Sequence, residues 1–535
     1  MGNAKGRGSR NECQNHVILK FPELRQDYIS CWDTVHHTVV NQEETAEMIV
    51  PDACPDILQI LDGEGKIFLQ RKEATEGRGE FSGLIKVCVL YLPEKGGGMR
   101  SMEAVLPFAC STESSAITRR SQLMAFPRIQ TVDVHVLNPR KILVKVNFII
   151  SLTCFTPKSI ELCTAVEKGD KYCIMQKMAE YRSHVAVAAT EKIFHYSDTL
   201  ALPAGRPPCV ELLRSRAECS CNEAKVIGNK LVFKGDAKVA ILYRGDDEAL
   251  HTADFNLPFS QITDCGEAGE DSIPEVRVIY TDMACKPAGE DGRNFTVELE
   301  LLAQAVLRKT ETRTVLTDLY STSYQAMPIR RAYPIQRKMD RGVAPETVRE
   351  VLETREPVET VMDVQVRPGQ LTAEKGSNVL TLSAEVEVFI LYLSQQGNMG
   401  SLHRRLIVPH EVPAANHWLY QCEFWVSREG NATPVGTGLE VSFTLEYAWT
   451  AMETSDLMAV EGVTLENRTR DITKPSSSVT IRAVRPGESL WELAKAYGTT
   501  ETEIAEANAL NSMEIYPGQL LLIPRAADSI TAEAV

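Results

Sequence analysis

Side chains that could do chemistry are present, but their spacing matches none of the common catalytic patterns. The chain has no HExxH zinc-protease motif, no GxSxG nucleophile elbow and no Walker A phosphate loop. His36 and His37 are adjacent, and neighbouring residues of a strand point to opposite faces, so they suit neither a metal pair nor a catalytic dyad. We interpret them as strand-edge or loop residues, and the cluster of Glu267, Glu270 and Asp271 as a solvated loop. We therefore predict no catalytic residue and no enzyme activity.

The 14 cysteines are scattered and form no CxxC pair. The closest two, Cys219 and Cys221, have the spacing of two strand residues on one face, and we find no further metal ligands beside them. The N-terminal stretch is basic but lacks the apolar core of a signal peptide, so we expect reduced thiols in a cytosolic compartment. We predict neither a metal site nor a cofactor.

Length and charge narrow the class of protein. The chain has 535 residues, which is enough for about three or four domains. Its hydrophobic share of 44% and charged share of 24% are typical of folded globular proteins. A formal net charge of −15 disfavours binding to nucleic acid or to an anionic membrane. No apolar run is long enough to span a bilayer, so we expect no membrane insertion.

Three segments share one pattern, in which an alternating apolar run ends in Leu-Tyr and is followed by a turn and a second run ending near Pro. They cover residues 83–108, 235–259 and 384–410. The aligned tyrosines, Tyr91, Tyr243 and Tyr392, lie about 150 residues apart, which is the size of one domain. We interpret each tyrosine as a core or hairpin residue that recurs because the fold recurs.

The pattern extends to both sides of each tyrosine. Pro55, Pro208 and Pro357 open a similar apolar stretch upstream. Downstream, every second residue of a long run is apolar, as in a strand with one buried face. These residues are Ile142, Val144, Val146, Phe148, Ile150 and Leu152; Phe295, Val297, Leu299, Leu301, Ala303 and Ala305; and Leu439, Val441, Phe443, Leu445, Tyr447 and Trp449. Each copy is predicted to be an antiparallel β domain, with helices between copies over 171–190 and 345–356.

The repeat resembles the SPOCS domain of endospore-forming bacteria, on VPDACPDILQIL (50–61), VLYL (89–92) and their flanking strands. The third copy departs most, with PVETVM in place of PDILQI. The resemblance implies a mainly β fold with three tandem sandwich- or barrel-like domains, short linking helices and a small α+β module of βααβ order. The expected divisions are an N-terminal segment (1–30), three repeats (31–165, 166–326 and 327–466), a flexible linker (467–478), the small module (479–525) and a tail (526–535).

The C-terminal module has the densest local signals. VTIRAV (479–484) and QLLLIP (519–524) are predicted strands. Capping-box spacing occurs twice between them, which predicts two helices, and Gly498 is placed to end the first. The capping pairs are Ser489 with Glu492 and Thr500 with Glu503. The predicted inward faces are Leu490, Leu493, Ala494 and Tyr497, then Ile504 and Ala507.

This module resembles the LysM family through V-x-x-G-E-S-L-W-x-L-A, T-x-x-x-I-x-x-x-N and I-x-P-G-Q-x-L-x-I-P in order. The resemblance implies a shallow groove for N-acetylated glycans between two loops, with apolar contacts from Leu490 and Ile515. The glycan- or partner-binding positions are Gly487, Glu488, Ser489, Leu490, Asn508, Ile515, Tyr516, Pro517 and Gly518. Helix capping alone explains Ser489, and turn geometry alone explains Gly487 and Gly518, so the motif predicts a fold more firmly than a ligand.

Three SPOCS-like copies followed by one LysM resemble the SipL-type spore coat assembly proteins. That resemblance implies a non-enzymatic scaffold in the mother-cell cytoplasm, which settles on the outer forespore surface. The expected partners are other coat proteins and a coat-basement ATPase of the stage IV sporulation protein A type. The alternative is a protein that anchors to N-acetylglucosamine-containing peptidoglycan of the cortex or wall. A hydrolase with an unrecognised site in the repeats is a third hypothesis, and internal triplication favours binding surfaces over it.

Overall fold

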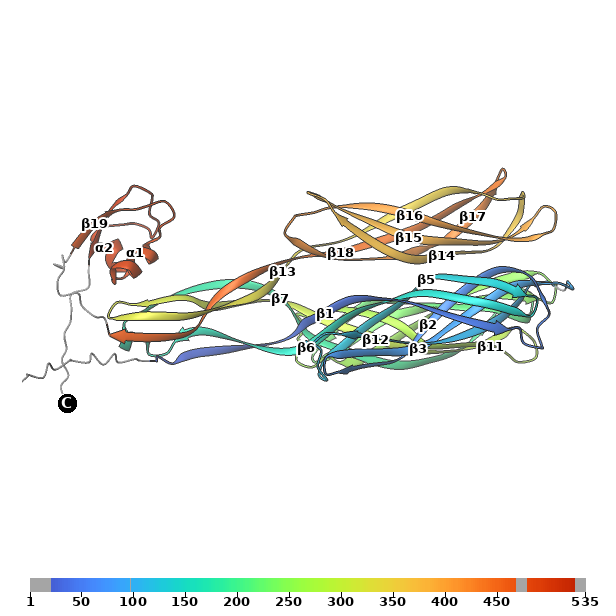
Figure 1. Cartoon of the computed structure of the whole chain (residues 1–535), viewed down its shortest axis with the longest axis horizontal. Coiled ribbons are helices and arrows are strands. Elements are labelled where there is room, and N and C mark those ends of the chain that lie inside the picture. The colour runs from blue at the N-terminus through green and yellow to red at the C-terminus, as the bar shows by residue number, and fades with distance from the viewer. Residues whose placement is uncertain (1–20, 97, 468–478, 525–535) are drawn as a thin grey trace, which may run out of the picture.

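The computed structural model describes residues 21–96, 98–467 and 479–524 (Figure 1). Within these residues, strands β1–β18 form three blocks of six with the same pairing order. In each block, the second, third and fourth strands make one antiparallel sheet. The first and fifth strands flank the sixth in another, and the two sheets pack as a sandwich. The mainly β fold is confirmed.

The blocks are contiguous in sequence. The first contains β1 (Leu24–Ile49), β2 (Ile57–Thr75), β3 (Arg78–Pro93), β4 (Arg100–Glu113), β5 (Gln122–Asn138) and β6 (Lys141–Val166). The second contains β7 (Ile174–Ala201), β8 (Cys209–Ile227), β9 (Lys230–Gly245), β10 (Leu250–Asp264), β11 (Ile273–Ala288) and β12 (Asn294–Ser321). The third contains β13 (Tyr324–Glu353), β14 (Val358–Lys375), β15 (Val379–Ser394), β16 (Met399–Pro413), β17 (Trp418–Val435) and β18 (Gly438–Asn467).

Period-two alternation builds each sandwich. Residues Ile142 to Leu152 of β6, taken every second position, are fully buried, and their counterparts in β12 and β18 are buried up to Tyr447. Trp449, the last predicted position, is half-buried and packs at the edge of the third core. Apolar side chains on one pleated face meet those of the facing sheet, which is the main stabilising term of each block.

The recurring tyrosines are core residues, as predicted. Tyr91 and Tyr243 are fully buried, and their hydroxyls donate to the carbonyls of Pro55 (3.3 Å) and Pro207 (3.1 Å). Each hydroxyl ties the loop before the second strand of its block to the third strand. The structure therefore aligns Pro55 with Pro207, one residue earlier than the predicted Pro208, because the same hydrogen bond recurs 36 residues upstream of the tyrosine.

The predicted linking helices are wrong. Residues 171–190 contain only the end of a 3-10 turn, Gly169–Tyr172, before β7 begins, and residues 345–356 belong largely to β13. β7 pairs continuously with β12, and β13 with β18 along its whole length. Without these partners, the long strands β12 and β18 would lose a row of backbone hydrogen bonds, so sheet pairing overrides local helix preference.

The three blocks pack around a shared centre. Asp62, Arg214 and Asp363 are equivalent residues, because each follows a register shift and lies opposite the residue before the recurring tyrosine. Apolar side chains from all three blocks surround them, namely Leu61, Leu90, Met99, Leu213, Leu242, Leu250, Phe389 and Leu391. The arrangement is a pseudo-threefold one, built by one chain with three unlike copies.

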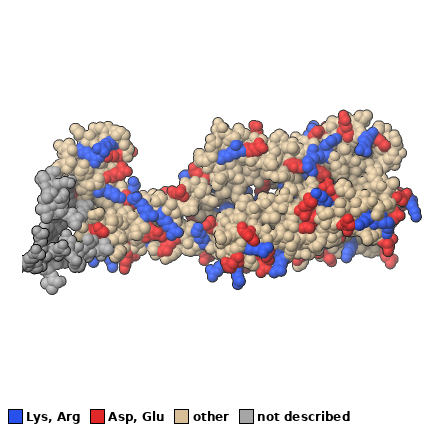
Figure 2. Space-filling model, in the orientation of Figure 1, with Lys and Arg blue, Asp and Glu red and all other residues tan. Residues whose placement is uncertain are grey.

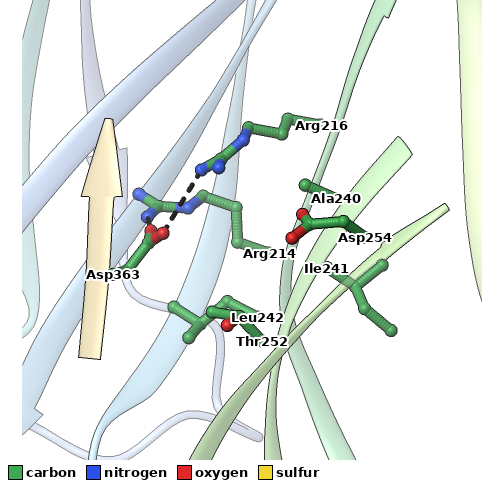
Figure 3. A pocket seen from close by; sticks show the side chains of 8 residues that line it. All are labelled: Arg214, Arg216, Ala240, Ile241, Leu242, Thr252, Asp254 and Asp363. Carbon is green, nitrogen blue, oxygen red and sulfur yellow. Dashed lines mark hydrogen bonds and ion pairs between the residues drawn. The ribbon is translucent and has the colours of Figure 1, made fainter. Parts of the chain in front are cut away.

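Charge complementarity joins the copies at this centre. Arg214 donates to Asp62 (2.5 Å) and Asp363 (2.5 Å), and its Nε lies 3.1 Å from Glu64. Figure 3 shows Arg214 and Arg216 both directed at Asp363, beside a cavity of only about 10 Å³. Burial alone would raise the pKa of Asp62, but Arg367 and Arg214 outweigh it and hold that pKa below its usual range.

The long first and sixth strands of each block continue beyond the sandwiches as a narrow stalk, toward the left in Figure 1. We define the stalk as residues 24–34, 156–166, 174–185, 310–321, 324–339 and 452–467. Its core is formed by all three ribbons, with Val166, Leu316 and Leu465 among the buried side chains. The first two blocks also share one sheet, in which Trp32 of β1 pairs with Ala186 of β7.

Candidate functional site

Local signals build the C-terminal module as predicted. Its elements are β19 (Val479–Ala483), α1 (Leu490–Tyr497), α2 (Glu501–Ala507) and β20 (Leu520–Pro524). Ser489 and Thr500 form complete capping boxes, and Gly498 ends α1 in the left-handed conformation. Leu490, Leu493, Ala494 and Ile504 are buried. Ala507 is exposed instead of inward, because Ala505 takes the buried position of α2.

The two loops expected to bind a ligand lie side by side. The amide of Gly518 donates to the carbonyl of Val484 (2.8 Å), and the amide of Val484 donates to the carbonyl of Gln519 (2.9 Å). Gly487 and Gly518 have φ values of 82° and 85°, which a side chain would strain. Backbone hydrogen bonds therefore bring the two loops together.

Several of the predicted binding residues have structural partners inside the module. Ser489 caps α1, and Leu490 is only 2% exposed in the module core, so it presents no surface to a ligand. Glu488 pairs with Arg482 and accepts from the amide of Arg485 (2.9 Å). These three side chains stabilise the first loop from within.

Asn508 is a structural tie between α2 and β20. Its Nδ2 donates to the carbonyls of Ile504 (2.8 Å) and Leu522 (2.7 Å), and its Oδ1 accepts from the amide of Leu522 (2.7 Å). Both amide donors and the oxygen are therefore engaged by the backbone. The LysM resemblance assigns Asn508 to ligand contact, but its three backbone hydrogen bonds alone account for an asparagine at this position.

The exposed part of the predicted site is small. Gly487, Pro517 and Gly518 are exposed, and Tyr516 is 65% exposed. Ile515 is half-buried against the module core. What the loops offer to a ligand is mainly backbone, the Tyr516 ring and part of Ile515.

Helix α1 of the module lies against the stalk. Trp491 donates from Nε1 to Asp318 of β12 (2.8 Å), and Lys495 reaches the same carboxylate at 2.6 and 2.8 Å. Tyr320 donates to the carbonyl of Thr499 (2.9 Å), and its ring meets Trp491 edge-on at 4.8 Å. Burial would raise the pKa of Asp318, but the hydrogen bonds from Lys495, Trp491 and Arg330 lower it. These contacts hold the module at the end of the stalk.

The outer face of the β19–β20 sheet is aliphatic, which sequence reasoning missed. The exposed fractions are 49% for Val479, 68% for Ile481, 69% for Leu520 and 40% for Leu522. Ile481 lies opposite Leu522 in the register, so the four side chains form one patch, named here the sheet face. The sequence did contain a signal for this patch. In V-T-I (479–481) and L-L-L (520–522), the residues that face away from the helices are apolar.

The histidines and cysteines considered from the sequence for catalysis or metal binding lie outside the C-terminal module. His36 and His37 bond to different threonines, Thr112 and Thr153, each at 2.9 Å. In the described ranges, no three His, Cys, Asp or Glu side chains are grouped as metal ligands, and the cysteines there are free thiols. No described helix is long and apolar enough to cross a membrane. Figure 2 shows acidic and basic side chains interspersed over the visible face.

Fold and site together define a multidomain β-repeat protein that carries a small binding module. The SipL SPOCS-domain family matches residues 56–137 and 210–287, which span β2 to β5 and β8 to β11. The LysM domain family matches residues 483–524. The chain therefore carries two SPOCS domains of the SipL type and a C-terminal LysM domain, which gives it a spore-coat context. Both are binding or scaffold modules, and neither is a catalytic domain. No curated protein matches the chain.

Proposed function

We propose that this chain is a non-enzymatic adaptor of the spore coat, which docks to a coat-basement protein through the sheet face of its LysM domain. The observation that carries the proposal is the orientation of the module. The α1 side is held by Asp318 and Tyr320 of the stalk, whereas Ile481 and Leu520 on the opposite side are the most exposed aliphatic side chains of the module. Exposed aliphatic clusters of this kind favour a protein partner over a polar glycan.

The proposed partner is an ATPase of the stage IV sporulation protein A type on the outer forespore surface, met from the mother-cell cytoplasm. This rests on the SipL resemblance. The proposal also treats residues 31–165, 166–326 and 327–466 as three SPOCS-like domains, because the third block repeats the strand order of the two that match. Several domains on one chain raise avidity through effective concentration.

Binding of the full chain to the purified ATPase tests the proposal. We expect the double variant Ile481→Ser and Leu520→Ser to weaken binding at least about tenfold, because a well-buried aliphatic side chain contributes on the order of 1.5–3 kcal/mol. Leu419→Ser, which changes a side chain that is 59% exposed on β17, is the matched control. Unchanged affinity in the double variant would reject the sheet face as the docking surface.

A second experiment tests the module as a whole. Deletion of 479–535 is expected to abolish localisation to the forespore.

A glycan-binding anchor is the second candidate, favoured by the paired loops and the exposed Tyr516 ring. Titration with chitin and peptidoglycan oligomers separates the two. Saturable glycan binding that Tyr516→Ala removes, together with no response to the ATPase, would replace the adaptor proposal with the anchor. Binding to the ATPase with no glycan response supports an adaptor that uses a sugar-binding fold to hold a protein.

A further inference from the structure

The outer face of the third sandwich carries a polar groove of about 270 Å³. Its lining side chains come from all three strands of the β13–β18–β17 sheet. They are Arg349, Arg428, Asn431, Thr433, Glu440 and Ser442. Val441 and Phe443 fill the sandwich core, so the alternate β18 residues Glu440 and Ser442 point to the outside.

A distortion of the edge strand shapes this groove. The pairing of β17 with β18 shifts register twice, on either side of Arg428. Arg428 lies opposite Thr444 and Asn431 lies opposite Ser442, while Arg349 of β13 reaches Ser442 from the other side. Bulges re-aim side chains and are common beside binding sites. The bulge positions Arg428 on one side of β18, and Arg349, where β13 pairs regularly with β18, lies on the other side.

Both arginines are exposed, and neither has a charge partner among the side chains that the structure describes. Among the side chains described in 21–96, 98–428, 430–467 and 479–524, none forms an ion pair or hydrogen bond with the guanidinium of Arg349 or Arg428. The two guanidinium groups line the same groove from opposite sides of β18. They leave ten N–H donors open to a ligand, five for each group.

The matching faces of the other two sandwiches differ. In the first block, Lys145 pairs with Glu43 at 2.8 Å, at the positions that correspond to Ser442 and Thr347. In the second block the same face carries Glu298 and Glu300, and His195 lies 3.9 Å from Glu300. The register equivalents of Arg349 are Thr45 and Ser197. Those of Arg428 are Thr131 and Asp282, so neither arginine recurs in the other two blocks.

The chemistry of the groove favours carboxylates. Guanidinium forks bind carboxylate or phosphate through paired hydrogen bonds. Glu440 would repel a dianionic phosphate but can accept a hydrogen bond from a peptide N–H. Ser442, Thr433 and Asn431 add short donors and acceptors that suit a polypeptide backbone. The volume is at the lower end for small-ligand sites, which fits a few residues of an extended segment.

We propose that this groove binds the side-chain carboxylates of an acidic segment in a partner protein, with Arg349 and Arg428 as the anchoring residues. The site is separate from the LysM sheet face and belongs to the SPOCS-like copy that lies outside the residues matched to that family. It gives the third copy a role of its own.

The test uses the full chain and a fluorescein-labelled hexaglutamate peptide, acetylated and amidated at its ends, in a polarisation titration at pH 7. We expect saturable, salt-sensitive binding that Arg349→Ala with Arg428→Ala weakens at least about tenfold. Glu440→Gln is expected to tighten it. Arg119→Ala with Arg120→Ala, which removes the same charge from an exposed loop of the first block, is expected to change affinity less than about twofold.

Three results would overturn the proposal. The first is that the wild-type chain does not bind the peptide. The second is that the two double-arginine variants bind it with equal affinity. The third is that inorganic phosphate displaces the peptide at a lower concentration than free glutamate does. The last would assign the groove to phosphate instead of carboxylate. Thermal unfolding of each variant shows that a loss of binding does not come from a loss of folding.

Discussion

Trp491 of the LysM domain donates its indole N–H to the carboxylate of Asp318, which lies 173 residues earlier on β12. Lys495 and Arg330 reach the same carboxylate from the module and from the stalk. One acidic side chain therefore joins three elements. Its removal leaves an indole donor and two cations without their shared acceptor, which is costlier than losing one surface pair.

We expect Asp318→Ala to release the LysM domain from the stalk without unfolding either part. Deuterium exchange should rise in α1 and in the last residues of β12, and remain unchanged in the sandwiches. Asp282→Ala, which breaks the single exposed pair with Lys86, is the control. If exchange rises in neither α1 nor the end of β12, the contact of Tyr320 with Trp491 is sufficient to hold the module.

Arg214→Met should be strongly destabilising. The substitution leaves Asp62 and Asp363 buried without their shared partner, and breaking a buried ion pair costs about 3–5 kcal/mol. Arg216→Met is the comparison, because Arg216 is partly exposed and has one contact with Asp363 at 3.5 Å. Free energies of unfolding from denaturant titration measure both. Equal losses for the two variants would contradict the central role of Arg214.

Stability should fall as the pH is lowered from about 6.5 toward 4 through His184. Burial, with Arg308 and Lys338 nearby, lowers the pKa of His184 to about 4. The ordinary pKa of histidine is about 6.5. Between these values the unfolded chain binds a proton that the folded chain does not, so stability rises with pH across this window.

The measurement is the melting temperature at pH 7 and at pH 5 for the wild type and for His184→Gln. We expect the difference between the two pH values to shrink in the variant, because the titrating group is gone. His195→Gln, which alters a side chain with 78% exposure, should leave the difference unchanged. An identical pH dependence in wild type and His184→Gln would show that other groups set it.

Two LysM positions should separate folding from ligand contact. Asn508→Ala removes three hydrogen bonds to the backbone and should destabilise the module by about 1–3 kcal/mol. Tyr516→Ala changes an exposed ring and should stay within about 0.5 kcal/mol. Exchange protection of α2 and β20 in the full chain measures both. If Tyr516→Ala loses protection and Asn508→Ala does not, then Tyr516 is the residue that stabilises the fold and Asn508 is not.

Much of the LysM domain could be predicted because its signals are local. Ser489 and Thr500 cap helices through residues three positions away, and Gly498 ends α1 through its own backbone. The binding positions stay a prediction, and the same residues also have partners in the fold. Leu490 and Asn508 show this, because core packing and backbone ties were invisible from spacing.

The sequence by itself determined the β class, the threefold repetition and the LysM domain. Alternation of apolar residues over a long run, as from Ile142 to Leu152, indicates a β-strand with one buried face. Recurrence of the tyrosine pattern then implies recurrence of the sandwich. These features depend on neighbours in the chain, which a sequence displays directly.

Only the tertiary structure decided the rest. The residues at 345–356 have helical preference, yet β18 draws them into a strand. Arg214, Asp62 and Asp363 come from three copies, and their meeting depends on how the sandwiches pack. The same holds for Trp491 on Asp318 and for the groove between Arg349 and Arg428. Each joins residues far apart in sequence, and their energies arise only when long-range packing excludes water from between them.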